Sequence, residues 1–416
     1  MPSRFQEMLS ANGQRGITSI CSAHPLVVRA AIEQAAGERG LLLIEATCNQ
    51  VNQDGGYTGM RPADFRAFVQ GIMARASFPE ERLLLGGDHL GPHPWRKLSA
   101  EDAMVKAEAM IAAYAKAGFT KIHLDASMPC GGDPAILPDE IVAARAARLA
   151  KVAEQNAATG LFYIIGTEVP VPGGASQGHE LAVTTSEAAA HTLAIHKQAF
   201  MKAGLEGAWG RVVGLVVQPG VEFDNLSVID YQPDKASALV QWRRQKASDV
   251  AFEAHSTDFQ RDAAYGALVT DGFAILKVGP GLTFAMREAI FALANIENEI
   301  VAVRERSRLV ETIRTVMMEN PAHWRDYYKG ADQEVLLFNS YSDRIRYYWP
   351  DLRIEAAMAK LIANLRAAPL PDILLSRDLP AQYARVRGGE LKRDPEALIV
   401  DKVRDVLRVY SDACRA

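Results

Sequence analysis

The amino-acid sequence predicts an α/β protein built as a closed barrel of parallel strands, followed by a helical C-terminal extension. Short apolar, β-rich runs recur through the first 280 residues, and each is followed by a segment with the apolar spacing of an amphipathic helix. The runs are continuously apolar, as expected of parallel strands that are covered on both faces. Eight such units in succession favour a closed (β/α)8 barrel, the TIM barrel, over an open sheet.

The eight predicted strands are rich in leucine and β-branched residues. They cover residues 16–23, 41–48, 82–88, 120–126, 161–167, 211–217, 249–255 and 273–279. The helices between them have starts that can be read from the sequence. Pro62 is typical of a first helical turn. The pairs Ser99–Asp102 and Thr184–Glu187 have the spacing of a capping box.

The pattern changes after the eighth strand. The last barrel helix is expected to run from about Thr283 to Arg306. Residues 307–416 contain no comparable strand. We therefore expect a barrel over residues 1–306 and a helical extension over the remainder.

Aromatic residues gather in two clusters of the predicted extension, at residues 323–330 and 341–350. Large aromatic side chains contribute most when they are buried in a core or an interface. We favour a packing surface against the barrel or a partner subunit, and a ligand site is the alternative.

The composition is that of an ordinary globular protein, with 49% hydrophobic and 23% charged residues. Lys and Arg number 46 against 50 Asp and Glu, which argues against nucleic acid or a membrane surface as a partner. The chain has no apolar run near the roughly 20 residues of a spanning helix and no signal peptide pattern, so we expect a cytoplasmic protein. Its four cysteines form no C-x-x-C pair and are expected to be reduced thiols.

Polar residues follow nearly every predicted strand. Catalytic groups of such barrels lie at the carboxyl ends of the strands and on the loops after them. In chain order the candidates are His24, Asn49, Asn52, Asp88, His89, Asp125, Glu168, Gln218, His255, Ser256, Thr257, Asp258, Lys277 and Gly279. Any one of them alone is more often a helix cap than a catalyst, but their convergence in one ring predicts a site.

The Asp88-His89 pair is the strongest candidate for chemistry. An imidazole is a usual zinc ligand, and an adjacent carboxylate can orient it or act as a base beside the metal. His255 is the expected second ligand, and Glu168 is a candidate third. This set leaves positions open for a substrate, as in a catalytic zinc site. The alternative is that both histidines are hydrogen-bonded structural residues, as we expect for His123.

Other features concern the substrate. Glycine-rich loops at residues 49–60 and 170–185 could close over a polar ligand, or could be plain surface loops. Lys277, with Gly279 at the start of a helix, could hold an anion such as a phosphate, or could pair with a strand-end carboxylate. Substrate contacts are expected from His24, Asn49, Asn52, Ser256, Asp258, Lys277 and Gly279, and catalytic carboxylates from Asp88, Asp125 and Glu168.

Several motifs resemble those of one known family. They are GGYTGM (55–60), GGDHLGP (86–92), KIHLDAS (121–127), GTEVPVPGG (166–174), VVQPGVEF (216–223) and EAHSTDF (253–259). Through them, and over most of its length, the chain resembles the non-catalytic Z subunits of D-tagatose-1,6-bisphosphate aldolase. The resemblance implies a TIM barrel that supports a class II aldolase catalytic subunit in galactitol, N-acetylgalactosamine or tagatose catabolism. A sugar phosphate is the implied ligand, and a homo-oligomer is a further expectation.

Members of this family are also labelled tagatose 6-phosphate kinases. The residues do not support a kinase, because the chain contains no G-x-x-x-x-G-K-[ST] and no G-x-G-x-x-G between a strand and a helix. We therefore expect no nucleotide cofactor.

More remotely, the strand order resembles the class II zinc-dependent aldolases. The resemblance implies that Asp88 is a base, that His89 and His255 bind zinc, and that Glu168 lies near a functional glutamate. Gln218 stands where those aldolases have another zinc-binding histidine, and we include it among the candidate ligands. Their glycine-rich phosphate loop is replaced here by the residues STDF. These departures argue against bisphosphate aldolase activity of this chain alone.

Two functions follow from the resemblance. The first is a subunit that supports the activity and stability of a catalytic aldolase partner. The alternative is a metal-dependent 4-epimerase of a ketohexose phosphate such as tagatose 6-phosphate, which would cleave a carbon–carbon bond and re-form it on the other face.

Overall fold

The computed structural model describes residues 2–9, 15–166, 181–330 and 332–415. Eight parallel strands close into a barrel in chain order, as predicted. They are β1 (Ile17–Cys21), β2 (Leu42–Thr47), β3 (Leu83–Leu90), β4 (Lys121–Leu124), β5 (Phe162–Ile165), β6 (Val212–Val216), β9 (Ala251–Ala254) and β10 (Ile275–Val278). The third strand extends two residues beyond its predicted end at Asp88, so Asp88 and His89 belong to the strand itself. A small antiparallel pair, β7 (Glu222–Phe223) and β8 (Val228–Ile229), lies in the loop after β6.

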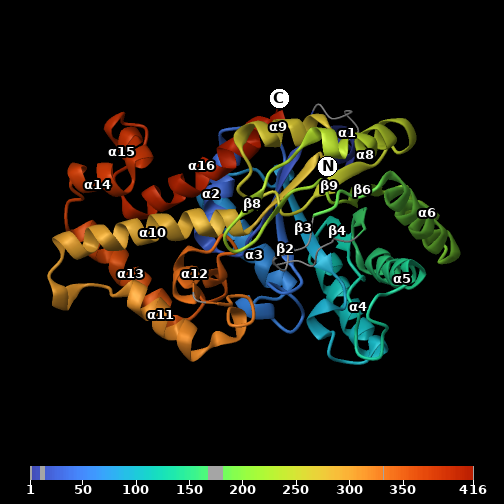
Figure 1. Ribbon diagram of the computed structural model, residues 1–416, viewed down its shortest axis with the longest axis horizontal. Coiled ribbons are helices and arrows are strands. Elements are labelled where there is room, and N and C mark those ends of the chain that lie inside the picture. Colours follow the sequence, from blue (N-terminus) through green and yellow to red (C-terminus); the bar gives the residue numbers. More distant parts are fainter. Residues whose placement is uncertain (1, 10–14, 167–180, 331, 416) are drawn as a thin grey trace.

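Helices follow the strands and surround the barrel (Figure 1). They are α2 (Pro25–Ala36), α3 (Pro62–Arg75), α4 (Ala100–Lys116), α5 (Asp139–Asn156), α6 (Ser186–Lys202), α7 (Glu206–Trp209), α8 (Pro233–Lys246), α9 (Asp262–Thr270) and α10 (Pro280–Ile300). Ser99 caps α4 as predicted, because its hydroxyl accepts a hydrogen bond from the Asp102 N–H. The cap of α6 is Thr185 and not Thr184, whose hydroxyl instead accepts from the Gln218 N–H at 2.8 Å.

The first helix, α1 (Pro2–Leu9), was not predicted and lies at the amino-terminal end of the barrel. Phe5 is fully buried and packs edge-on against Phe162 of β5, with ring centroids 5.3 Å apart. It belongs to a compact apolar cluster formed by the inner residues of the strands. The helix therefore closes the end of the barrel opposite to the strands' carboxyl ends.

All regular elements among the described residues of the C-terminal part are helices, in agreement with the prediction. Its helices are α11 (Leu309–Glu319), α12 (Gln333–Asn339), α13 (Leu352–Ala367), α14 (Asp372–Asp378), α15 (Pro380–Arg387) and α16 (Pro395–Arg415). Figure 1 shows α11 to α15 gathered on one side of the barrel, around the long helix α10. The helix α10 ends at Ile300, six residues before the predicted end at Arg306.

The last helix returns to the barrel and packs against α2, α9 and α10. The Gly16 N–H donates a 2.9 Å hydrogen bond to the Cys414 carbonyl, next to the start of β1. The hydroxyl groups of Tyr410 and Thr257 lie 3.0 Å apart. The division into a barrel and an extension at residue 306 stays a prediction. The last helix, α16, belongs to the predicted extension and packs directly on the helices of the barrel.

Charged side chains lie inside the barrel below its carboxyl end. The Lys121 ammonium contacts Glu45 at 2.6 Å and Glu253 at 2.8 Å, and all three side chains are buried. A Cβ on Gly86 would come within 2.3 Å of the Glu45 carboxylate, so glycine makes room for this ion pair. The four cysteines are buried and unpaired with one another, as expected. Among the described helices, none has the length and apolar character needed to cross a membrane.

Candidate active site

A cavity of about 930 Å³ opens at the carboxyl ends of the strands. Ten of the residues expected at the strand ends line it: His24, Asn49, Asp88, His89, Asp125, His255, Ser256, Asp258, Lys277 and Gly279. The barrel therefore brings together side chains that lie far apart in the sequence, as the ring of polar residues predicted.

Asp88 lies at the base of this cavity and is fully buried. One of its oxygens, Oδ1, forms an ion pair with the Lys277 ammonium and lies 3.0 Å from His123 Nδ1. Burial alone would raise the pKa of this carboxyl group, but the neighbouring His89 and Lys277 hold it well below its usual range. Asp88 is therefore ionised. Of the two partners considered for Lys277, the structure shows the strand-end carboxylate.

His89 is held in an unusual backbone conformation, with a φ of 49°. Its Nδ1 lies 2.8 Å from Asp125 Oδ2, and its Nε2 lies 3.1 Å from the Lys277 ammonium. Burial lowers the pKa of His89, so the ring is neutral near pH 7. A neutral ring that donates from Nδ1 to Asp125 presents an Nε2 lone pair to the cavity.

Asp125 is thereby the residue that orients His89. Burial by itself would raise the pKa of Asp125, but its interactions with His89, His123 and Ser127 together hold this pKa well below its usual range. Its other oxygen accepts a 2.7 Å hydrogen bond from the Ser127 hydroxyl. Both oxygens are engaged within the protein.

The His255 ring contacts the His89 ring edge-on, with ring centroids 5.0 Å apart. Its Nε2 lies 3.0 Å from Glu253 Oε1, and its two ring nitrogens lie 3.3 and 3.4 Å from the Lys277 ammonium. Lys277 therefore contacts Asp88, His89 and His255 at once. The spacing of two residues between Glu253 and His255 could have predicted that they share one side of the strand.

The donor atoms around Asp88 suit a divalent metal ion in their chemistry. Ligand atoms of Asp88, His123, Glu253 and His255 all lie within 4.8 Å of one another, and the four side chains are buried. This group contains His255 but not His89, the other histidine expected as a ligand, and it includes His123, which was expected to be structural. Imidazole and carboxylate groups are usual ligands of zinc and other first-row metals. In this structure the Lys277 ammonium lies against donor atoms of the same region, so a metal ion would have to compete with an internal cation.

Asp258 occupies the corner where an anion was expected. Its Oδ1 accepts hydrogen bonds of 3.0 Å from the Gly279 N–H and 2.7 Å from the Gly281 N–H, at the start of α10. Burial raises the pKa of Asp258 to about 6. The amide groups that could have bound a phosphate at this helix terminus are thus satisfied by a side chain of the protein itself.

Two expected site residues, Gln218 and Asn52, make their contacts outside the cavity, and a third, Glu168, lies outside the described residues. Gln218 Oε1 accepts hydrogen bonds from the N–H groups of Gly220 and Val221, which shapes the turn after β6. Asn52 likewise stabilises its own loop through a 2.9 Å bond to the Cys48 carbonyl. Neither is among the described residues that line the cavity. Glu168 and most of the loop at 170–185 lie outside the described residues.

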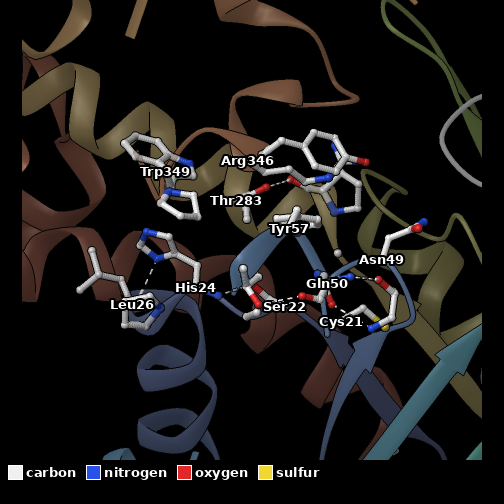
Figure 2. A pocket seen from close by; sticks show the side chains of 18 of the residues that line it. Cys21, Ser22, His24, Leu26, Asn49, Gln50, Tyr57, Thr283, Arg346 and Trp349 are labelled. Atoms are coloured by element: carbon white, nitrogen blue, oxygen red, sulfur yellow. Dashed lines mark hydrogen bonds between the residues drawn. The ribbon is translucent and has the colours of Figure 1, made fainter. Parts of the chain in front are cut away.

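The C-terminal part supplies cavity residues that were not expected there. Arg346, Tyr347 and Trp349 line the cavity, and all belong to the aromatic cluster at 341–350. Tyr347 packs on Tyr57 with centroids 4.9 Å apart, and Trp349 packs on His24 at 5.8 Å. Figure 2 shows Trp349 above His24, and Arg346 close to Tyr57. The cluster therefore packs against the barrel, as favoured, and also forms part of the cavity wall.

The fold and the cavity together define the class of protein. It is a TIM barrel whose ionisable side chains converge in a cavity at the carboxyl ends of the strands. The chain belongs to the GatZ/KbaZ-like family of D-tagatose-1,6-bisphosphate aldolase subunits, whose family model matches residues 4–415. The resemblance found in the sequence motifs is thus confirmed.

The chain is also similar to several solved structures. The chain is similar to a protein described as a probable tagatose 6 phosphate kinase from Sinorhizobium meliloti 1021, with 53% identity and a TM-score of 0.90. That match covers 96% of this chain and 100% of the other. Two distant matches are the YdjI aldolase from Escherichia coli K12, with 12% identity, and a fructose-bisphosphate aldolase from Campylobacter jejuni, with 14% identity. Both have a TM-score of 0.43. The match to the YdjI aldolase covers 88% of this chain and 98% of the other. The match to the Campylobacter jejuni protein covers 91% of this chain and 93% of the other.

Proposed function

We propose that this chain is itself an enzyme that inverts carbon 4 of a ketohexose phosphate by breaking and re-forming the bond between carbons 3 and 4. The observation that carries the proposal is the buried group of Asp88, His89, His255 and Lys277 at the base of a large cavity. Burying so many ionisable groups is costly, and perturbed ionisable groups in a cleft are typical of catalytic sites.

The proposed reaction begins with a proton transfer to Asp88. This carboxylate takes the proton from the hydroxyl group on carbon 4 of the substrate. The oxygen then forms a carbonyl, the bond between carbons 3 and 4 breaks, and its electron pair moves to carbon 3 and the carbon 2 carbonyl as an enediolate. The second fragment is an aldehyde that remains in the cavity.

Re-addition completes the inversion. The enediolate attacks the opposite face of the aldehyde, and Asp88 returns its proton to the new alkoxide. Lys277, whose ammonium group lies beside His89 and His255, donates hydrogen bonds to the negative oxygen of the enediolate. No atom is gained or lost, so neither an oxidant nor a second substrate is required.

A divalent metal ion would assist the same step. His255, from the compact ligand group, and His89, the further ligand expected from the sequence, would hold it, and it would polarise the carbonyl oxygen of the substrate. Asp125 supports this role, since its bond to His89 Nδ1 directs Nε2 into the cavity. The identity of the ion is left to the experiment.

A supporting subunit of a class II aldolase is the second candidate. The description of the family as aldolase subunits favours it. The engagement of the Gly279 and Gly281 amides by Asp258 also favours it, because these amides are not available to a second phosphate group of a bisphosphate. In that role the chain would associate with the catalytic subunit in galactitol, N-acetylgalactosamine or tagatose catabolism. Phosphoryl transfer from a nucleotide is disfavoured, because the usual phosphate-binding motifs are missing from the sequence.

An assay of the purified chain separates the two candidates. Tagatose 6-phosphate and fructose 6-phosphate are incubated with the chain, with and without Zn²⁺ or Mn²⁺, and products are followed by ¹³C NMR. The proposal predicts interconversion of the two esters, and loss of this activity in Asp88→Asn. No turnover by the chain alone, together with increased activity of an added class II aldolase subunit, would favour the supporting role.

A further inference from the structure

We propose that Arg346, supplied by the C-terminal part of the chain, binds the phosphate group of the substrate. This inference rests on the proposed function, since it names the group that holds one end of the same ligand. It concerns a residue that the strand-end pattern does not include, because Arg346 follows the barrel by tens of residues.

The charges on the cavity wall single out Arg346. Lysine and arginine side chains of the described residues line the cavity at three positions, 277, 346 and 366. Lys277 pairs with Asp88, and Arg366 pairs with Asp394 and Glu396, each at 2.8 Å. Within the described part of the chain, no carboxylate forms an ion pair with the Arg346 guanidinium. A bound anion would supply that counter-charge.

Arg346 is held in place by neutral groups. Its Nη1 donates to the carbonyl oxygens of Ser342 and Asp343, and its Nη2 donates to the Tyr347 hydroxyl at 2.9 Å. The nearest acidic side chain of its own segment, Asp343, is engaged by Arg287 Nε at 2.7 Å. These bonds fix the guanidinium while leaving it charged, as expected of an anion-binding arginine.

The surroundings provide further donors for a phosphate. Tyr57 and Tyr347 line the same cavity, and their rings are in contact. Figure 2 shows Arg346 beside Tyr57 and Thr283, on the side of the cavity formed by the C-terminal part. Burial raises the pKa of Tyr57 to about 12, so its hydroxyl keeps its proton and can donate.

The other cationic corner of the cavity is less suited to phosphate. The N–H groups of Gly279 and Gly281 already donate to Asp258, and an added phosphate there would meet that carboxylate. Lys277 lies beside the ionised Asp88 and serves the reacting end of the ligand in the proposed mechanism. The geometry therefore places the phosphate at Arg346 and the carbonyl end at Lys277.

The test measures binding of inorganic phosphate to the full-length chain by isothermal titration calorimetry. Arg346→Gln removes the charge and is expected to weaken binding roughly tenfold or more. Arg346→Lys keeps the charge and should retain part of the affinity. Arg366→Gln is the matched control, because it removes a cavity arginine that already has carboxylate partners, and it should bind phosphate as the wild type does.

A wild-type crystal soaked in selenate locates the anion without any substitution. An anomalous peak at the Arg346 guanidinium supports the inference, even if Arg346→Gln fails to fold. Phosphate binding that is undetectable in the wild type, or equal in Arg346→Gln, would overturn it, as would a selenate peak at another place in the cavity only.

Failure of this inference can be distinguished from failure of the proposed function. Equal kcat/KM values for fructose and fructose 6-phosphate would retain the epimerase and reject the phosphate site. Phosphate binding at Arg346 without turnover of any ketose phosphate would retain the phosphate site and reject the epimerase.

Discussion

The Asp258 carboxylate accepts a 2.7 Å hydrogen bond from the backbone N–H of Gly281, at the first turn of α10. Helix amino termini commonly bind anions, and here the anion is a side chain of the loop after β9. This arrangement fills the corner of the barrel in which a phosphate was considered from the sequence. It also places a buried carboxyl group next to the cavity.

The pH dependence of stability should report this carboxyl group. Burial raises the pKa of Asp258 to about 6, from the ordinary value of 3.8 for an aspartic acid. Between these pH values the folded chain keeps a proton that the unfolded chain has lost, so the free energy of unfolding falls as the pH rises through this window. Asp258→Asn has no such charge to bury. We expect it to be more stable than the wild type above pH 6, by about 2–3 kcal/mol.

Urea unfolding of both proteins between pH 4 and pH 8 measures this difference. Among the described residues, Arg346, Tyr265 and Tyr410 interact with the charge of Asp258, and these three groups keep their charge states over this range. The advantage of Asp258→Asn should therefore disappear near pH 4. Parallel stability curves for the two proteins would contradict the assignment.

Metal occupancy should separate the histidines from Asp88. His89→Ala and His255→Ala each remove an expected ligand, so we predict that both variants lose the ion. Asp88→Asn keeps the size of the side chain and should retain the ion, while turnover falls by roughly 10²-fold or more because the base is lost. Metal analysis of the purified variants provides the measurement. Full occupancy in both histidine variants would leave them as structural residues.

Lys277 should oppose metal binding. Its ammonium lies 3.1 Å from His89 Nε2 and contacts Asp88, so a divalent ion in this region meets a like charge. Lys277→Met removes that charge and keeps much of the apolar stem. We expect its affinity for Zn²⁺ to rise by about tenfold or more in calorimetric titration. An unchanged affinity would show that the ion and the ammonium group do not compete.

The last helix should be required for a stable barrel. Leu398, Ile399, Val403 and Leu407 of α16 are buried, and each buried aliphatic side chain contributes about 1.5–3 kcal/mol. Their sum is comparable to the whole stability of a typical domain, so deletion of residues 395–416 should prevent cooperative folding.

Tyr410→Phe is the mild counterpart of that deletion. It keeps the ring contact with Tyr265 and loses the hydroxyl contact with Thr257, at a cost of about 1 kcal/mol. Thermal unfolding followed by circular dichroism compares the proteins. A truncated chain that melts at the wild-type temperature would contradict this role of α16.

The barrel could be predicted because its signal is local and repeated. Each strand is a short apolar run, and Ser99 shows that even a helix cap can be read from one residue and its spacing. The position of α16 could not be predicted in this way. Its packing on α2 and α9 joins residues more than a hundred positions apart, and amphipathic spacing identifies a helix without identifying its neighbour.

The site was predictable where the fold rule applies. Asp88, His89, His255 and Lys277 meet because strand ends converge in any such barrel. Arg346 lies on a segment outside the repeated pattern, so no spacing connects it to the strand ends. Its only sequence signal was the surrounding aromatic cluster, which is equally typical of a packing surface.

The central claim is that the chain inverts carbon 4 by carbon–carbon cleavage, and an isotope at that carbon tests it most directly. Fructose 6-phosphate carrying deuterium on carbon 4 is incubated with the protein in ordinary water, and the tagatose 6-phosphate formed is examined by NMR and mass spectrometry. Cleavage and re-addition never break the bond between carbon 4 and its hydrogen, so we predict an epimerised product that retains the deuterium in full. Absence of the epimer, or an epimer that has exchanged its deuterium for hydrogen, would contradict the account.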